Sequence, residues 1–94
     1  MILSIKKDIN NNGIEYKEVN INDNNNLDMI IKYSNGETKK KTLYDPFFPV
    51  NIIKFLGTDS VVEEIYNAVN KHYNFNKSFD SCIDYIYNDF NENY

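Results

Sequence analysis

Residues 27–37 constrain the fold most strongly, because they join a strand pattern to a hairpin turn. Apolar side chains occupy every second position from Leu27 to Tyr33, as in a strand with one buried face. Asn35-Gly36 follows almost at once. Asn-Gly in a two-residue loop is the strongest short hairpin signal, because both central positions need positive φ. The segment therefore predicts an antiparallel sheet.

Two more strands are expected beside this one. Residues 14–21 alternate, with a slip of phase between Tyr16 and Val19 that suggests a bulge. Residues 37–44 are hardly apolar and contain the consecutive lysines Lys39–Lys41, which are typical of an edge strand protected against pairing with another chain. Together the strands predict a three-stranded antiparallel meander.

A short helix is expected before the sheet, over residues 2–9. The spacing of Ile2, Ile5 and Ile9 fits a helix better than a strand. Gly13 suits the left-handed residue that follows a helix. A strand over residues 2–6 is the alternative.

Three helices are predicted after the strands. Pro49 can begin a short helix from Val50 to Leu56, which Gly57 can end. Ser60–Glu63 matches a capping box before a helix over about residues 61–73, with Val61, Ile65, Val69 and Tyr73 facing inward, together with Val62 and Ala68. A second long helix, over about residues 79–91, carries an apolar stripe of Phe79, Cys82, Ile83, Ile86, Tyr87 and Phe90.

These elements predict one α+β domain over residues 1–94, since a chain of this length makes a single domain. Its expected architecture is a short N-terminal helix, a three-stranded antiparallel sheet, then a short helix and two C-terminal helices in a two-layer sandwich. No apolar run approaches the ~20 residues that span a bilayer. The start lacks the features of a signal peptide, and the one cysteine fits a reducing compartment. We therefore expect a cytoplasmic protein.

Charge is distributed unevenly along the chain. Residues 1–56 contain eight Lys and seven acidic residues, a net +1, whereas residues 57–94 contain two Lys and seven acidic residues, a net −5. The acidic half argues against sequence-independent nucleic-acid binding, which needs cations to neutralise phosphates. It favours a basic protein partner, or solubility alone.

Catalysis, metal binding and cofactor binding are not expected. His72 and Cys82 are the one pair that suggests nucleophilic chemistry, but Cys82 falls on the apolar stripe of its helix, where a thiol is inert. No spacing matches a zinc or calcium motif, and the glycines are too far apart for a phosphate loop. Lys39 and Lys41 would face one way and Lys40 the other, so β-sheet recognition of nucleic acid by these three lysines is not favoured.

Three segments resemble a family of small phage-encoded type II-A anti-CRISPR proteins, which inhibit an RNA-guided DNA nuclease. They are Leu27–Tyr33 running into Asn35-Gly36, Ser60–Ile65 at the start of the first long helix, and Tyr87–Asp89 late in the last helix. Members of the family are similarly short and acidic. The resemblance implies an N-terminal helix, a three-stranded antiparallel sheet and two C-terminal helices.

In that family, acidic and amide groups imitate DNA at the site where arginines of the nuclease read the short motif beside the target. Carried over by position, the resemblance implies the partner-binding residues Asp23, Asn35, Gly36, Glu37, Asp80 and Asp84. Tyr85 joins them because exposed tyrosines are enriched at binding sites. The implied function is a DNA-mimicking inhibitor of a bacterial defence complex, acting on a CRISPR effector nuclease in the host cytoplasm.

Two other functions stay open. One is a non-enzymatic interaction or regulatory domain, such as an antitoxin, an immunity protein or a homodimeric accessory factor that associates through a free sheet edge. The other is an RNA-binding module that uses the strand containing Lys39–Lys41.

Overall fold

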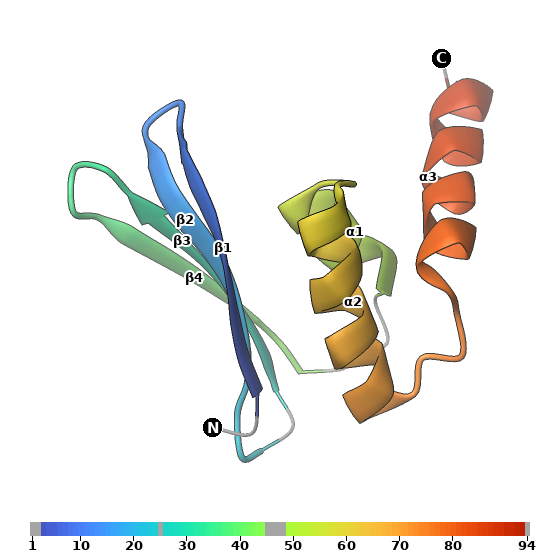
Figure 1. Cartoon of the computed structure of the whole chain (residues 1–94), viewed down its shortest axis with the longest axis horizontal. Helices are drawn as coiled ribbons and strands as arrows, with labels where there is room; N and C mark the ends of the chain where they lie inside the picture. The colour runs from blue at the N-terminus through green and yellow to red at the C-terminus, as the bar shows by residue number, and fades with distance from the viewer. Residues whose placement is uncertain (1–2, 25, 45–48, 94) are drawn as a thin grey trace. The chain divides into compact units, whose positions relative to one another are not determined.

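Four strands come first in the chain and three helices follow. The computed structural model describes residues 3–24, 26–44 and 49–93, with side chains up to residue 88 in the last helix. The elements are β1 (Leu3–Asn11), β2 (Ile14–Ile21), β3 (Leu27–Tyr33), β4 (Thr38–Leu43), α1 (Pro49–Leu56), α2 (Ser60–Tyr73) and α3 (Phe79–Asn93) (Figure 1). The strands belong to one compact unit, Met1–Pro46, and the helices to a second, Phe47–Tyr94. We call these the sheet unit and the helical unit; that they form one domain stays a prediction.

The predicted N-terminal helix is wrong. Residues 3–11 form strand β1, so the chain has a four-stranded sheet and not a helix followed by three strands. Ile2 lies outside the described residues. The side chains from Leu3 to Ile9 alternate between half-buried and exposed, which is the period of a strand. An isolated helix of eight residues is marginal in water, whereas β1 gains a full ladder with β2.

A hairpin turn at Asn12-Gly13 explains why residues 3–11 form a strand and not a helix. Asn12 has φ of 54° and Gly13 has φ of 80°, so both central residues are left-handed, as a type I′ turn requires. Asn11 lies opposite Ile14 across this two-residue connection. Gly13 therefore connects two strands instead of ending a helix.

The second Asn-Gly sequence forms a different turn. Gly36 has φ of 94°, but Asn35 is not among the residues with positive φ. The amide of Tyr33 donates to the carbonyl of Glu37 at 2.9 Å, and the amide of Gly36 donates to the carbonyl of Tyr33 at 3.1 Å. The connection is thus a three-residue loop with a left-handed glycine at its end, not the predicted two-residue loop.

The sheet is antiparallel throughout, in the order β1-β2-β3-β4. The predicted strands over residues 14–21 and 27–33 are confirmed, and β4 lies at an edge as its lysines indicated. The predicted bulge in β2 is misplaced, because the register against β3 shifts between Ile14 and Tyr16 and runs unbroken from Tyr16 to Ile21. A second shift lies in β1, between Asp8 and Asn11, where Asn10 has φ of 50°.

One half of one sheet face is apolar and buried. The register places Leu3, Ile21, Leu27 and Leu43 in one row across the four strands, and Ile5, Val19 and Met29 in the next. Val19, Ile21 and Leu27 are fully buried. At roughly 25 cal/mol per Å² of apolar surface, such burial is the main favourable term in folding.

In the helical unit, the predicted helices over residues 50–56, 61–73 and 79–91 are confirmed within two residues at each end. Gly57, with φ of 103°, ends α1 and donates its amide to the carbonyl of Ile53. The predicted cap of α2 is wrong by one residue. Asp59, not Ser60, is the N-cap, and its carboxylate accepts from the amide of Val62 at 2.9 Å.

Of the apolar stripes predicted for α2 and α3, Val62, Ile65, Val69, Phe79 and Cys82 are buried. Ala68, Tyr73, Ile83 and Ile86 are half-buried, and two residues are exposed. Val61 is 47% exposed and Tyr87 is 60% exposed, although both were expected to face inward. Tyr66 takes the buried place on α2 that the sequence analysis left unassigned. The side chain of Phe90 lies outside the described residues. None of the helices that the structure describes is both long and apolar enough to cross a bilayer.

Candidate partner-binding surface

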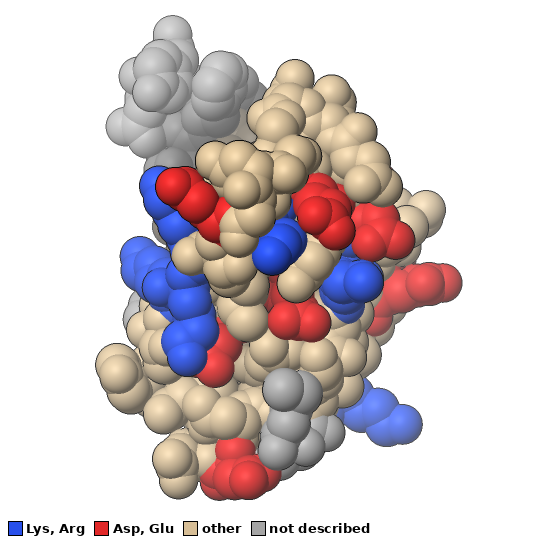
Figure 2. All heavy atoms as spheres, turned by 90° about the vertical axis from the view of Figure 1, so that its left-hand side faces the viewer, with Lys and Arg blue, Asp and Glu red and all other residues tan. Residues whose placement is uncertain are grey.

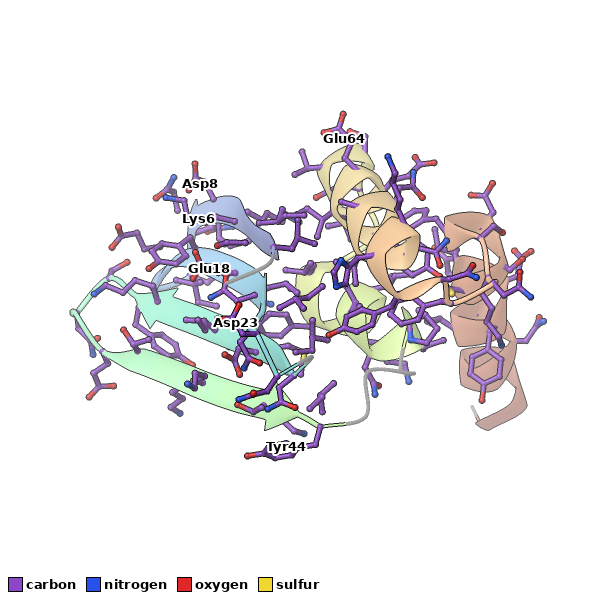
Figure 3. The ribbon with its side chains drawn as sticks, turned by 90° about the horizontal axis from the view of Figure 1, so that it is seen from below. Lys6, Asp8, Glu18, Asp23, Tyr44 and Glu64 are labelled. Carbon is purple, nitrogen blue, oxygen red and sulfur yellow. The ribbon has the colours of Figure 1, made fainter. Side chains whose placement is uncertain are left out.

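The predicted partner-binding residues of the sheet unit lie at opposite ends of the sheet. Asp23 is exposed in the loop between β2 and β3, and Asn35–Glu37 form the exposed turn between β3 and β4 (Figure 3 labels Asp23). The seven residues of β3 separate the two connections, which corresponds to roughly 20 Å. The structure therefore does not bring Asp23 together with the turn.

The turn at Asn35–Glu37 is ordered by its own side chain. The amide of Glu37 donates to Asn35 Oδ1 at 2.9 Å, and Lys32 Nζ donates to the carbonyl of Gly36 at 3.3 Å. A hydrogen bond also connects this turn to the hairpin between β1 and β2, because the amide of Ser34 donates to the carbonyl of Gly13 at 2.9 Å. The amide oxygen of Asn35 thus accepts a hydrogen bond within the turn and is not directed at a partner.

The remaining predicted residues share one exposed strip of α3. Asp80, Asp84 and Asn88 recur every four residues, so they lie on the same side of the helix, and all three are exposed. Tyr85 and Tyr87 flank this acidic strip on its two sides and are 57% and 60% exposed. We call these five residues the α3 strip.

The α3 strip is strongly acidic and carries large apolar area. The sequence of α3 contains no Lys or Arg, so no cation of the helix itself neutralises the carboxylates. A tyrosine offers a broad apolar ring and a hydroxyl with little conformational entropy to lose, which explains its enrichment at binding sites. The sequence analysis missed Tyr87 because its position continues the apolar stripe. The breadth of that stripe was the available signal, since Phe79, Cys82, Ile83, Ile86 and Tyr87 cover more of the helix than one contact face needs.

α3 begins at a well-defined cap, which fixes where its strip starts. Ser78 Oγ accepts from the amide of Ser81 at 3.1 Å, and the carbonyl of Ser78 accepts from the amide of Cys82 at 3.2 Å. Asp80 lies in the first turn, where a carboxylate is stabilised by the positive end of the helix dipole.

The polar side of the sheet has its charges largely matched. Asp28 Oδ1 accepts from Thr42 Oγ1 at 2.6 Å, and Lys40 Nζ lies 4.0 Å from Asp28 Oδ2. Lys6 and Asp8 lie 3.9 Å apart on β1, beside each other in Figure 3. Seen from the side that the sheet occupies in Figure 1, lysines and acidic residues are interspersed (Figure 2). Such mixed charge is typical of a solvated face and marks no partner of one sign.

His72 and Cys82 lie in different surroundings. Cys82 is 1% exposed, and its sulfur lies 3.4 Å from the hydroxyl of Tyr66. His72 is exposed and packs its ring edge-on against Tyr73. Burial, followed by the Cys82 contact, raises the pKa of Tyr66, and burial also raises that of Tyr73. Both phenols therefore stay protonated at neutral pH.

Within residues 3–24, 26–44 and 49–93, no three His, Cys, Asp or Glu side chains come close enough together to hold a metal ion. No protein-family model, no curated protein and no solved structure matches the chain.

Proposed function

We propose that the protein acts by binding another protein, without catalysis, through the α3 strip. The observation that carries this proposal is the pair of exposed tyrosines, Tyr85 and Tyr87, on either side of the carboxylates of Asp80 and Asp84. The partner surface that this arrangement fits is basic, with Arg or Lys side chains that pair with the carboxylates and stack on the rings.

The charge of the helical unit supports the same partner chemistry. Residues 47–94 contain three Lys and seven acidic residues, a net −4, whereas residues 1–46 contain seven of each, a net zero. A net negative unit steers a basic surface toward itself over distances of a Debye length, about 8 Å at physiological salt. The whole excess charge of the protein thus belongs to the unit that carries the α3 strip.

A bacterial defence complex, such as an RNA-guided nuclease with its arginine-lined DNA site, is one basic partner of this kind. The anti-CRISPR resemblance implied an N-terminal helix followed by three strands, whereas the chain has four strands before its helices. The proposal therefore rests on the α3 strip and not on that resemblance. An immunity or accessory protein with a basic partner would use the same surface.

The test uses the tagged full-length protein to capture partners from a bacterium that has an active CRISPR system, and compares variants. Asp80→Lys/Asp84→Lys and Tyr85→Ala should each abolish recovery of the captured protein. Glu64→Lys, on the exposed surface of α2, is the matched charge-reversal control and should leave recovery unchanged. Retention by the first two variants, with loss in Asp23→Lys or Glu37→Lys, would move the binding surface to the sheet unit and contradict the proposal.

A further inference from the structure

The register of the sheet gathers lysines that are far apart in the sequence onto one face. Lys7 lies opposite Lys17 across β1 and β2, Lys17 lies opposite Ile31 of β3, and Ile31 lies opposite Lys39 of β4. Residues directly opposite each other in a ladder point to the same face. Lys41, two residues after Lys39, points to that face as well, opposite Met29. The lysines thus continue the sheet face whose other half is apolar and buried.

Glu15, which lies at the register shift of β2 two residues before Lys17, is the one acidic strand residue that alternation assigns to this face. Alternation along the strands places Asp8, Glu18 and Asp28 on the other face, as their cross-strand partners Tyr16, Ile30 and Thr42 confirm. That other face also holds Lys6 and Lys40, which lie 3.9 Å from Asp8 and 4.0 Å from Asp28 respectively. We call the set Lys7, Lys17, Lys39 and Lys41 the lysine face.

An aromatic ring lies among these cations. Tyr33 belongs to the same face of β3 as Ile31, and both are half-buried. Lys39 Nζ lies 5.7 Å from the centroid of the Tyr33 ring, within the range of a cation–π contact. Lys39 and Lys41 are both exposed, so their ammonium groups are accessible to a ligand.

We propose that the lysine face binds single-stranded nucleic acid, with phosphates on the lysines and a base stacked on Tyr33. Positive charge along a backbone track, together with an aromatic platform, is how sequence-tolerant single-strand binders work. Lysine suits phosphate as a point charge, whereas recognition of carboxylates in a protein favours the planar fork of arginine, which this chain lacks.

That direct nucleic-acid binding is unlikely stays a prediction of the sequence, and the present proposal is its alternative. The prediction rested on the acidic charge of residues 57–94 and on β4, where Lys40 does point away from Lys39 and Lys41. Lys7 and Lys17 come from the first hairpin, one strand of which was expected to be a helix. With that helix, Lys7 would not belong to the lysine face.

The first experiment measures binding of 5′-labelled 20-nucleotide oligo(dT) and oligo(U) by fluorescence anisotropy, at several salt concentrations. We expect Lys39→Gln/Lys41→Gln to weaken binding at least roughly tenfold and to reduce the slope of log K against log salt by about 1.4, since each phosphate contact on a single strand contributes about 0.7. Lys32→Gln/Lys40→Gln removes the same charge from the opposite face of the neighbouring strands β3 and β4. This control should weaken binding less than about threefold, by its long-range charge alone.

The second experiment separates stacking from charge. Tyr33→Ala should weaken oligonucleotide binding at least roughly fivefold, as expected for loss of one stacked base, while Tyr33→Phe should retain it. Tyr16→Ala, on the other face beside Lys6, is the matched control and should have no effect. Circular dichroism of each variant checks that the sheet is intact.

Three results would overturn the proposal. One is the absence of any anisotropy change at low salt with the wild-type protein. Another is equal weakening by the two lysine pairs, which would indicate charge without a site. The third is binding of poly-glutamate or heparin as tight as that of the oligonucleotides and insensitive to Tyr33→Ala, which would identify a general polyanion surface or an acidic protein partner.

Discussion

The sheet unit and the helical unit differ in what determines which side chains are buried. In the helical unit, apolar residues three and four positions apart make a stripe, and local periodicity decides which side chains are buried. In the sheet unit, the face to which a residue points has meaning only once its partner strand is known. The helical unit can be interpreted from one helix at a time, whereas the sheet unit depends on pairings between segments far apart in the chain.

Charge follows the same division. The carboxylates of α3 lie on one strip because residues four apart share a side, which the sequence shows directly. The members of the lysine face come from three strands, and their gathering on one face appears only in the register. The two charged surfaces therefore differ in how they can be disrupted, by local substitutions in the helical unit and by register or turn changes in the sheet unit.

The largest effect on stability is expected from Tyr66, which is fully buried in the interior of the helical unit. Its ring packs within 6.2 Å of those of Phe75 and Phe79, and its hydroxyl donates to the carbonyl of Lys77 at 2.6 Å. Tyr66→Ala should lower the free energy of unfolding by about 3–5 kcal/mol through the cavity it leaves. Urea denaturation followed by far-UV circular dichroism measures the loss.

Tyr66→Phe is the companion variant, since it keeps the ring and removes only the hydroxyl. It should cost about 1 kcal/mol, the net contribution of a typical hydrogen bond. If the phenylalanine variant lost as much stability as the alanine variant, the hydroxyl and not the packing would hold the segment between α2 and α3. That result would mean that the apolar stripes alone do not determine the structure of the helical unit.

In the sheet unit, the turn at Asn12-Gly13 should matter more than any single exposed strand residue. Gly13→Ala places a Cβ on a residue with φ of 80°, which costs about 1–2 kcal/mol, although no atom lies close enough to clash with it. Asn12→Gly keeps a residue that tolerates positive φ and should change the midpoint of urea unfolding little. Equal stability of Gly13→Ala and the wild-type protein would mean that ladder pairing, and not the turn, fixes the register of β1.

Much of the fold could be predicted from the sequence, and the largest failure, the N-terminal helix, has a local cause. The strands over residues 14–21 and 27–33 and all three helices follow from local periods and end signals. The N-terminal segment failed because Ile2, Ile5 and Ile9 fit a helical spacing, whereas Leu3, Ile5 and Ile9 fit a strand. The turn at Asn12-Gly13 favours the strand over the helix. It has the same sequence as Asn35-Gly36, which was predicted to be a turn.

The candidate surfaces were predictable to different degrees. The exposure of Tyr85 and the burial of Cys82 follow from their places on α3 and agree with the structure. Tyr87 was wrongly placed on the inward stripe, because its position continues that stripe and tyrosine is compatible with either side of an amphipathic helix. Of the lysine face, the sequence predicted only that Lys39 and Lys41 point the same way. Lys7 and Lys17 join them only through the pairing of β1 with β2, of β2 with β3 and of β3 with β4.

The smallest effect concerns the start of α2, where two adjacent residues compete as the cap. The Asp59 carboxylate accepts from the amide of Val62, and the Asp59 carbonyl accepts from the amide of Glu63 at 3.0 Å, so removing the side chain leaves one helix donor without its partner. Asp59→Ala should therefore lower the free energy of unfolding by about 1 kcal/mol. Ser60→Ala, at the first helical position, should be nearly neutral, because its hydroxyl caps nothing. A capping box beginning at Ser60 requires the reverse order of costs. That reverse order, measured by urea unfolding of the two variants, would show that the start of α2 follows the sequence motif and not the geometry of Asp59.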